Sequence, residues 1–331
     1  MFGATGHTGG FMVAELLRRG FAAAAVGRDG AKLARIQDRG VAIRTASIED
    51  AASLDGALAG AAAVVNCAGP FLDTADAVAS AALRARIPYF DVTAEQASAQ
   101  ATFARFDAAA CKAGIVLVPA MGFFGGLGDL LATAAIADWD SADEIGIGIA
   151  LDSWRPTPGT RLTGARNTAR RLVIADGKLI PQPLPARETL WDFPEPFGRQ
   201  DVTEVPLSEI ILIARHLRVS TLHTYLNNAP LRDLGTPSTP PPIAADESGR
   251  SAQTFLVEAI VRKGRKTRRA VARGRDIYAF TAPLVVEAVQ RVLNGRVRGS
   301  GALAPGEMFD AKNFLEALAP VHLQLEIGDE W

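Results

Sequence analysis

The stretch Gly3-Ala4-Thr5-Gly6-His7-Thr8-Gly9 decides the fold of this chain. Its glycines recur at every third position, which lets a backbone turn sharply, approach a pyrophosphate closely and pack the next helix tightly against a strand. We predict that helix over residues 9–19, with its unpaired amides and positive dipole end directed at an anion in the turn. An apolar strand at 21–26 follows, so the start of the chain predicts a strand–turn–helix–strand unit.

The first strand of this unit is short. Only Met1 and Phe2 precede the turn, whereas such a strand usually supplies about five or six residues. Because a doubly wound sheet places this strand at its centre, we expect a gap in the most buried row. We interpret the chain as starting inside the strand.

Composition restricts the class of protein. A length of 331 residues suggests about two domains, and 48% apolar with 21% charged residues is typical of a globular protein. A net charge of −1 disfavours nucleic acid or an anionic membrane as a partner. The apolar stretches are too short to span a membrane, and no secretory signal is visible. Cys67 and Cys111 form no CxxC pair, which is typical of a reducing compartment. We expect a cytoplasmic protein.

Strands and helices alternate up to residue 130. Five short apolar strands are predicted, at 21–26, 41–45, 63–67, 89–92 and 115–119. Alanine-rich amphipathic helices are predicted between them, including 74–86 and 96–113. This order indicates a Rossmann-type α/β domain over residues 1–130, a doubly wound parallel sheet covered on both faces. A ligand is expected beyond the carboxyl ends of the strands, beside residues 67–71, 93–95 and 121–128.

The pattern changes after residue 130. Strands are predicted in succession at 144–151, 209–216, 219–226 and 254–262, with a helix at 160–174 and a proline-rich loop at 236–242. This order predicts a second, α+β domain over 131–275 with a mixed or antiparallel sheet, for substrate binding or dimerisation. Helices return over 281–293 and 310–319, and we expect residues 276–331 to pack back on the first domain.

The end of the second strand bears on the choice of cofactor. NAD-dependent enzymes usually carry Asp or Glu there, but this chain has Gly27 and Arg28, with Lys32 one turn later. A guanidinium binds a 2′-phosphate bidentately, through two hydrogen bonds. The arginine at this position therefore favours NADP(H) over NAD(H). Asp29 either pairs with Arg28 or caps the next helix.

These segments together resemble the saccharopine dehydrogenase-like oxidoreductases, which include saccharopine reductase and the bacterial trans-acting enoyl reductases. The resemblance covers most of the chain. It rests on residues 3–9, Gly-Arg-Asp-Gly-Ala-Lys-Leu at 27–33, Val-Val-Asn-Cys-Ala-Gly-Pro-Phe at 64–71, Tyr-Phe-Asp-Val-Thr-Ala-Glu at 89–95, Phe-Thr-Ala at 280–282 and Ala-Leu-Ala-Pro at 302–305. It implies an NADP-binding Rossmann domain, a second domain often used for dimerisation, and hydride chemistry.

The resemblance also implies roles for individual residues. The residues that would bind the pyrophosphate are Gly3, Thr5, Gly6, His7, Thr8 and Gly9. Arg28 would bind the 2′-phosphate, and the nicotinamide ribose would lie beside Ala68, Gly69, Pro70 and Phe71. Two motifs depart from the family. Its Thr-Gly-Glu is Thr93-Ala94-Glu95 here, and an acid, a hydroxyl and a proline are missing from the substrate-facing loop at 122–130.

Hydride transfer also needs a proton donor or acceptor near the nicotinamide. The Tyr-x-x-x-Lys pair of short-chain dehydrogenases is absent, because none of the three tyrosines has a lysine four residues later. Thr93 and Glu95 at a strand end are candidate catalytic residues, with helix capping as the alternative. His216 is a third candidate, because Arg215-His216 would end a strand of the second domain. Cys67 would be an acid or a buried filler beneath the cofactor.

No His/Cys/Asp cluster has the spacing of metal ligands, so we predict no metal. The basic run 262–275 is interpreted as an exposed hairpin rather than a nucleic-acid site, because aromatic residues are not interleaved in it. The sequence thus predicts an NADP(H)-dependent oxidoreductase, expected as a homodimer, acting on a C=O, C=N or C=C of a small or acyl-type substrate. The alternative is a non-catalytic Rossmann protein that senses NADP(H) or binds a partner.

Overall fold

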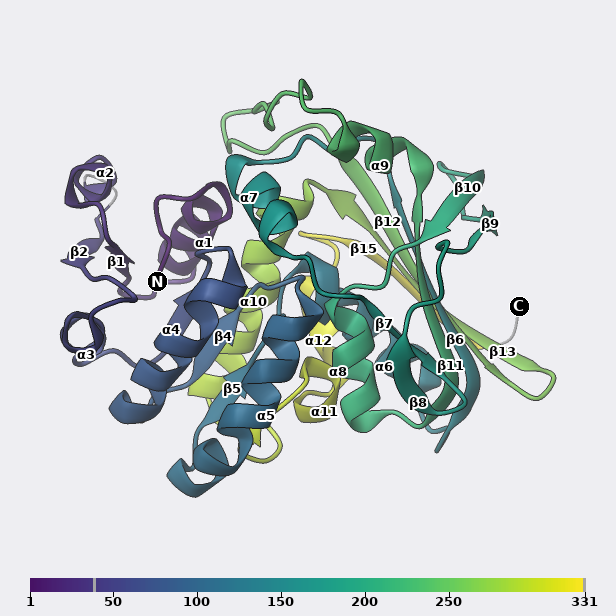
Figure 1. Cartoon of the computed structure of the whole chain (residues 1–331), viewed down its shortest axis with the longest axis horizontal. Coiled ribbons are helices and arrows are strands. Elements are labelled where there is room, and N and C mark those ends of the chain that lie inside the picture. Colours follow the sequence, from purple (N-terminus) through teal and green to yellow (C-terminus); the bar gives the residue numbers. More distant parts are fainter. Residues whose placement is uncertain (38–39, 330–331) are drawn as a thin grey trace.

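The computed structural model describes residues 1–37 and 40–329. Two sheets and the helices around them build the molecule, and helices of the C-terminal third lie between the sheets (Figure 1). This arrangement confirms the predicted class, a Rossmann-type parallel sheet followed by a second, mixed α+β part.

The first sheet is parallel throughout. Its strands are β1 (Ala24–Gly27), β2 (Ala42–Thr45), β3 (Val64–Asn66), β4 (Tyr89–Asp91), β5 (Val116–Val118) and β14 (Gly301–Ala302). They form two groups, β2-β1 and β3-β4-β5-β14, and Phe2 forms a parallel bridge to each group. The five strands predicted from residues 21–119 are therefore all present, each within a few residues of its expected bounds.

Residues at the start of the chain fill the central row of this sheet. The Phe2 amide donates to Val65 O at 2.8 Å, and the Phe2 carbonyl accepts from the Cys67 amide at 2.9 Å. On the other side, Val26 N donates to Met1 O at 2.8 Å and Gly3 N donates to Val26 O at 3.0 Å. The backbone of Met1–Gly3 thus joins the two groups of strands in the central row, where the sequence predicted a gap.

Helices cover both faces of the first sheet. They are α1 (His7–Arg18), α2 (Gly30–Ala34), α3 (Ala51–Leu58), α4 (Phe71–Ala85) and α5 (Gln96–Ala113). Helix α1 begins two residues earlier than predicted and packs against α10 (Ile277–Leu293), whereas α4 packs against both α3 and α5.

The second sheet is mixed and has nine strands in the described chain. Its main order is β15-β13-β12-β6-β11-β10-β9, and the β7–β8 hairpin adds to β11. Strands β6 and β11 are parallel, and the other pairs are antiparallel. The bounds are β6 (Ala142–Leu151), β7 (Leu172–Ala175), β8 (Lys178–Pro181), β9 (Glu188–Asp192), β10 (Arg199–Glu204), β11 (Val219–Asn227), β12 (Thr254–Lys263), β13 (Lys266–Arg275) and β15 (Gln324–Asp329).

The remaining helices lie between the strands from β5 onward in the chain. They are the π-helical turn η2 (Phe123–Leu127), α6 (Gly128–Ile136), α7 (Pro158–Arg166), α8 (Ser208–His216), α9 (Asn228–Gly235), α11 (Pro305–Met308) and α12 (Ala311–Leu318). Helix α6 is buried except at Thr133, and it packs on β12 and β13 as well as on α8 and α12. One continuous apolar cluster therefore runs from the first sheet through these helices to the second.

Two sequence predictions in the second half are wrong. Residues 209–216, predicted as a strand, form α8. The apolar run Ile210–Ile213 is buried in succession, and so short a run shows no period that separates a buried helix from a buried strand. The helix predicted over 160–174 ends at Arg166, and Ile174 lies in β7, where Leu222 of β11 is its partner.

The C-terminal residues divide between the sheets. Strand β14 pairs with β5, whereas β15 pairs with β13 at the edge of the second sheet. Residues 276–331 were expected to return to the first domain, and only part of this segment, including α10 and β14, packs there.

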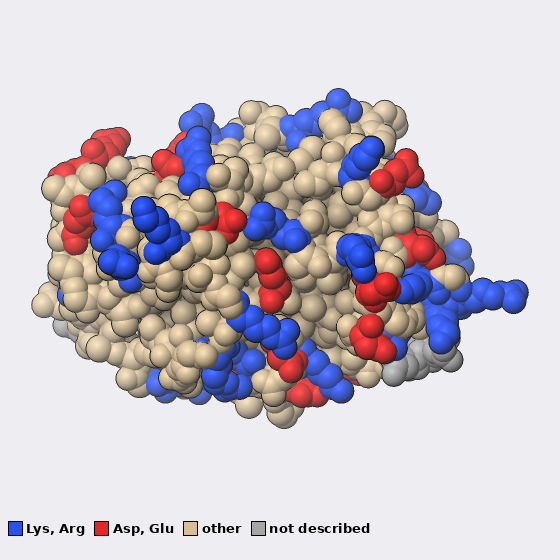
Figure 2. Space-filling view, turned by 90° about the horizontal axis from the view of Figure 1, so that it is seen from below, with Lys and Arg blue, Asp and Glu red and all other residues tan. Residues whose placement is uncertain are grey.

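The basic run at 262–275 forms the β12–β13 hairpin, and many of its cations face carboxylates. Arg262 lies 3.1 Å from Glu144, Arg268 lies 2.6 Å from Asp138, and Lys263 pairs with Asp140. On the face drawn in Figure 2, basic and acidic side chains are intermixed. No helix of the described chain has both the length and the apolar character that a membrane crossing requires.

Candidate functional site

A cavity of about 1440 Å³ lies where the first sheet meets the second part of the chain. It is lined by the turn before α1, by the β1–α2 and β3–α4 connections, and by Val92, Ala94 and Glu95. Phe123 and Phe124 of η2, Trp154, residues 157–167 around α7, and the start of α10 also line it. It therefore lies beyond the carboxyl ends of the parallel strands, as predicted.

The glycine turn is shaped by close backbone contacts. Gly3 has φ +80°, and a Cβ there would lie 2.8 Å from the Ala68 amide nitrogen. A Cβ on Gly9 would lie 2.2 Å from Gly3 O, so α1 can reach the turn only because position 9 has no side chain. No side chain caps α1, and its first turn contains no acidic residue. The positive end of α1 thus opens toward the cavity with room for an anion.

Ten of the eleven residues predicted to bind the cofactor line this cavity: Gly3, Thr5, Gly6, His7, Thr8, Arg28, Ala68, Gly69, Pro70 and Phe71. Gly9 is buried behind the turn and packs against Gly3, outside the cavity lining. The turn, the β1 end and the β3–α4 connection therefore lie around one space, as the sequence predicted.

Arg28 is exposed at one end of the cavity, and no partner holds its guanidinium among the described residues. Asp29 takes the second of its two predicted roles: its Oδ1 accepts from the Lys32 amide at 3.0 Å and caps α2. Its Oδ2 lies 3.7 Å from Lys32 Nζ. The carboxylate is thus directed to the helix rather than to Arg28.

Glu95 lines the cavity, but its carboxylate holds a helix. Its two oxygens accept from the amides of Phe71 at 3.0 Å and Leu72 at 2.9 Å, which satisfies the start of α4. Burial raises the pKa of Glu95 despite these two bonds. The helix that Glu95 serves is α4, not the following helix that the capping alternative assumed.

Thr93 is fully buried and does not line the cavity. Its Oγ1 accepts from the Glu95 amide at 3.0 Å, and Asp91 Oδ1 accepts from the Thr93 amide at 3.0 Å. The structure therefore gives Thr93 a place in the turn that positions Glu95, and no access to a substrate.

His216 does not reach the cavity either. It ends α8, and its Nε2 lies 2.7 Å from Asp129 Oδ1 on α6. Asp129 Oδ2 also accepts from the Gly306 amide at 2.7 Å, so the pair joins α6, α8 and α11. His216 was predicted as a catalytic candidate because it was expected to end a strand that faces the substrate. The segment is instead helix α8, which directs this histidine into the packed interior.

Cys67 lines the cavity beside the turn. Burial raises the pKa of its thiol to about 12, so it stays protonated at neutral pH. No three His, Cys, Asp or Glu side chains gather as a metal site anywhere in residues 1–37 and 40–329.

Sequence reasoning missed an aromatic part of the cavity wall. The Tyr278 hydroxyl accepts from Trp154 Nε1 at 2.9 Å and lies 2.9 Å from Thr160 Oγ1. Phe124 stacks on Trp154 with ring centroids 5.0 Å apart and planes at 27°. Phe124 in the loop at 122–130 thus forms an aromatic surface together with Trp154. These residues come from three distant segments, and no local pattern in the sequence links them.

Comparison with known proteins agrees with this geometry. Residues 3–113 match a family model described as NAD(P)H-binding. No curated protein matches the chain in sequence. Among solved structures, saccharopine dehydrogenase (L-Glu forming) from Saccharomyces cerevisiae is similar with a TM-score of 0.68 and 13% identity, covering 99% of this chain and 98% of that one.

Two further solved structures are less similar. GenD2 from gentamicin A biosynthesis, in complex with NAD, has a TM-score of 0.46 at 15% identity over 99% of this chain and 95% of that one. An NADPH-dependent quinone oxidoreductase from Escherichia coli has a TM-score of 0.29 at 22% identity, over 41% of this chain and 50% of that one. The chain therefore has the fold of saccharopine dehydrogenase, with an NAD(P)H-binding Rossmann domain that contains the glycine turn.

Proposed function

We propose that this protein is an NADP(H)-dependent oxidoreductase that transfers hydride to or from a C=O, C=N or C=C of a small or acyl-type substrate. The observation that carries the proposal is the uncapped start of α1, which opens into a cavity of about 1440 Å³ beside the matched NAD(P)H-binding segment. The bound nicotinamide would supply the hydride chemistry.

The chain's own residues would bind and orient the nucleotide. The amides at the start of α1 would hold the pyrophosphate, and Gly3 and Gly6 allow its close approach. The nicotinamide ribose would lie along Ala68–Phe71, where Glu95 fixes the backbone of α4. The aromatic wall formed by Phe124 and Trp154 would then exclude water from the substrate side of the cavity.

Arg28 supports a preference for NADP(H). Its guanidinium is available at the end of β1, where a 2′-phosphate would lie, and Asp29 is directed to the α2 amides. The test is a titration with NADPH and with NADH, followed by nucleotide fluorescence. We expect NADPH to bind about tenfold or more tightly than NADH, and Arg28→Ala to remove that difference.

The matched control is Arg35→Ala, which removes an exposed arginine of the same segment that does not line the cavity. It should leave the preference unchanged. If neither nucleotide binds, the proposed function is wrong. If NADH binds as tightly as NADPH, or if Arg28→Ala changes nothing, only the assignment of NADP(H) is wrong.

The state of the polar groups in the cavity favours a second candidate, a protein that binds NADP(H) without turnover. Glu95 is bonded to α4, Tyr278 to Trp154 and Thr160, and the Cys67 thiol is protonated. NADPH consumption across a panel of carbonyl, imine and enoyl compounds separates the two. Turnover of any of them supports the oxidoreductase, and tight NADPH binding with no turnover across the panel supports the sensor.

A further inference from the structure

Arg171 occupies a fixed position in the wall of the cavity. It lies directly before β7, and Gln96 at the start of α5 clamps the neighbouring backbone. Gln96 Oε1 accepts from Leu172 N at 2.7 Å, and its Nε2 donates to Leu172 O at 2.9 Å and to Leu207 O at 3.0 Å. The base of the Arg171 side chain is therefore held against the carboxyl end of the first sheet.

Arg171 is half-buried and has few hydrogen-bond partners within the described protein. Its one hydrogen bond in the described chain is a long contact of 3.4 Å from Nη1 to Pro206 O, and no carboxylate lies within ion-pair distance of it there. Burial lowers the pKa of Arg171, partly offset by the buried carboxylate of Glu209 on α8, whose own Oε1 accepts from Leu207 N at 2.9 Å. Most of the five donors of Arg171 therefore have no partner within the described protein and are available to a molecule in the cavity.

The other arginines along the same wall differ from Arg171. Arg166 pairs with Asp73 at 2.9 Å, and Arg161 donates to the carbonyls of Thr236 at 3.1 Å and Thr239 at 2.9 Å. Arg166 is thus held by an ion pair, and Arg161 by two hydrogen bonds from its Nη2. Arg171 has neither kind of anchor, because its one hydrogen bond in the described chain is long.

We propose that Arg171 binds an anionic group of the substrate, specifically a carboxylate, so that the substrate class is a carboxylate-bearing carbonyl, imine or enoyl compound. The inference rests on the proposed function, because it assigns the nucleotide phosphates to the start of α1 and to Arg28 and leaves Arg171 to the substrate. A planar guanidinium fork matches a carboxylate through two parallel hydrogen bonds. The apolar part of the substrate would meet the aromatic surface of Phe124 and Trp154.

The test compares two probes of the same shape, 4-fluorobenzoate and the neutral 4-fluorobenzamide. Their binding is followed by fluorine NMR relaxation, with and without saturating NADPH. Wild-type protein should bind the carboxylate about tenfold more tightly than the amide. Arg171→Met should remove the difference, Arg171→Lys should keep part of it, and Arg161→Met, the matched control, should keep all of it.

NADPH affinity and circular dichroism of each variant report whether the fold is intact. Absence of carboxylate binding by the wild type, equal binding of the two probes, or a preference retained in Arg171→Met overturns the inference. A large loss of NADPH affinity in Arg171→Met also overturns it, because Arg171 would then serve the nucleotide. A carboxylate preference that depends on Arg171 in a protein that binds no nucleotide supports the anion site and rejects the proposed function alone.

Discussion

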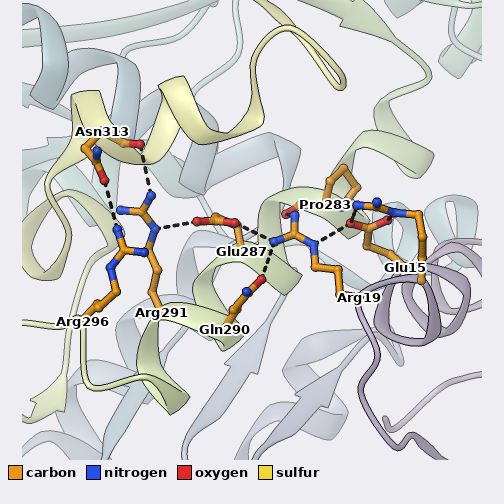
Figure 3. Close-up of polar contacts among 9 residues, drawn as sticks. Glu15, Arg19, Pro283, Glu287, Gln290, Arg291, Arg296 and Asn313 are labelled. Atoms are coloured by element: carbon orange, nitrogen blue, oxygen red, sulfur yellow. Dashed lines mark hydrogen bonds and ion pairs between the residues drawn. The ribbon is translucent and has the colours of Figure 1, made fainter.

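Arg19 Nη1 lies 2.6 Å from Glu287 Oε2, and this contact joins α1, the helix that follows the glycine turn, to α10. Figure 3 shows that the pair belongs to a chain of alternating charges that runs from Glu15 through Arg19 and Glu287 to Arg291. Helix α10 also carries Tyr278, so the network fixes the two walls of the cavity relative to each other.

Glu287→Gln should destabilise the protein strongly. Arg19 and Arg291 are largely buried, and both would lose their shared carboxylate, which costs about 3 kcal/mol in the free energy of unfolding. Urea unfolding measures the loss. The control is Asp55→Asn, which breaks an exposed pair with Arg84 and should cost no more than about 0.5 kcal/mol.

The effect of Glu287 depends on pH. Burial alone would raise the pKa of Glu287, but hydrogen bonds from Arg291 and Arg19 bring it below the usual value of 4.5. Its stabilisation is therefore fully present above that value and is lost as the pH falls through the folded-state pKa. The difference between wild type and Glu287→Gln should shrink in acid. A difference that grows on acidification would contradict this assignment.

Gly9→Ala should disrupt the nucleotide site by displacing the glycine turn, although Gly9 itself does not line the cavity. The new Cβ would lie 2.2 Å from Gly3 O, so the turn or the helix has to move, at a cost of about 1–3 kcal/mol and with loss of NADPH binding. The control is Gly56→Ala in the middle of α3, where a Cβ meets nothing within 4 Å. That change should gain up to about 1 kcal/mol. Normal NADPH affinity in Gly9→Ala would refute the packing argument.

The first sheet could be predicted from the sequence because its signals are local. The glycine turn, the short apolar strands and the amphipathic helices each lie within one stretch of chain, and each needs no partner to be identified. Helix α8 shows the opposite case. Its apolar residues Ile210–Ile213 are buried in succession, and a run of this length shows no period that separates a helix from a strand.

The candidate site divides in the same way. The glycine turn was predictable from the sequence. The hydrogen bond between Trp154 and Tyr278 was not, because it joins residues 124 positions apart and depends on the topology of the second sheet. The strand end at 93–95 was identified, but its chemistry was not. The alternation of residues along the strand does not reveal that both carboxylate oxygens of Glu95 accept hydrogen bonds, one from the Phe71 amide and one from the Leu72 amide.

Glu95→Gln tests whether this carboxylate is structural. An amide can accept only one of the two hydrogen bonds, and its NH₂ group would face a donor at the start of α4, so we expect a loss of about 1–2 kcal/mol in unfolding free energy. NADPH should bind more weakly, because α4 begins beside Gly69 and Pro70. Glu49→Gln, an exposed carboxylate at the same cavity, is the control and should change neither quantity. Unchanged stability in Glu95→Gln would return Glu95 to the catalytic candidates.

His216→Gln should separate stability from nucleotide binding. The side chain lies outside the cavity, so NADPH affinity should stay at the wild-type value, whereas loss of the contact with buried Asp129 should cost about 3 kcal/mol. Burial opposes protonation of His216, but Asp129 raises its pKa above the usual 6.5. Its contribution is then complete below 6.5 and is lost as the pH rises through the folded-state pKa.

Urea unfolding at about pH 6 and about pH 9 measures this dependence, and the cost of His216→Gln should be larger at the lower pH. His322→Gln is the matched control with the opposite sign. Burial lowers the pKa of His322, so the wild-type histidine disfavours the fold in acid and its removal should stabilise the protein there. An equal cost of His216→Gln at both pH values would mean that the histidine binds Asp129 in its neutral form. A loss of NADPH affinity in that variant would instead couple α8 to the nucleotide site through Asp129 and α6, the helix that directly follows the aromatic turn η2.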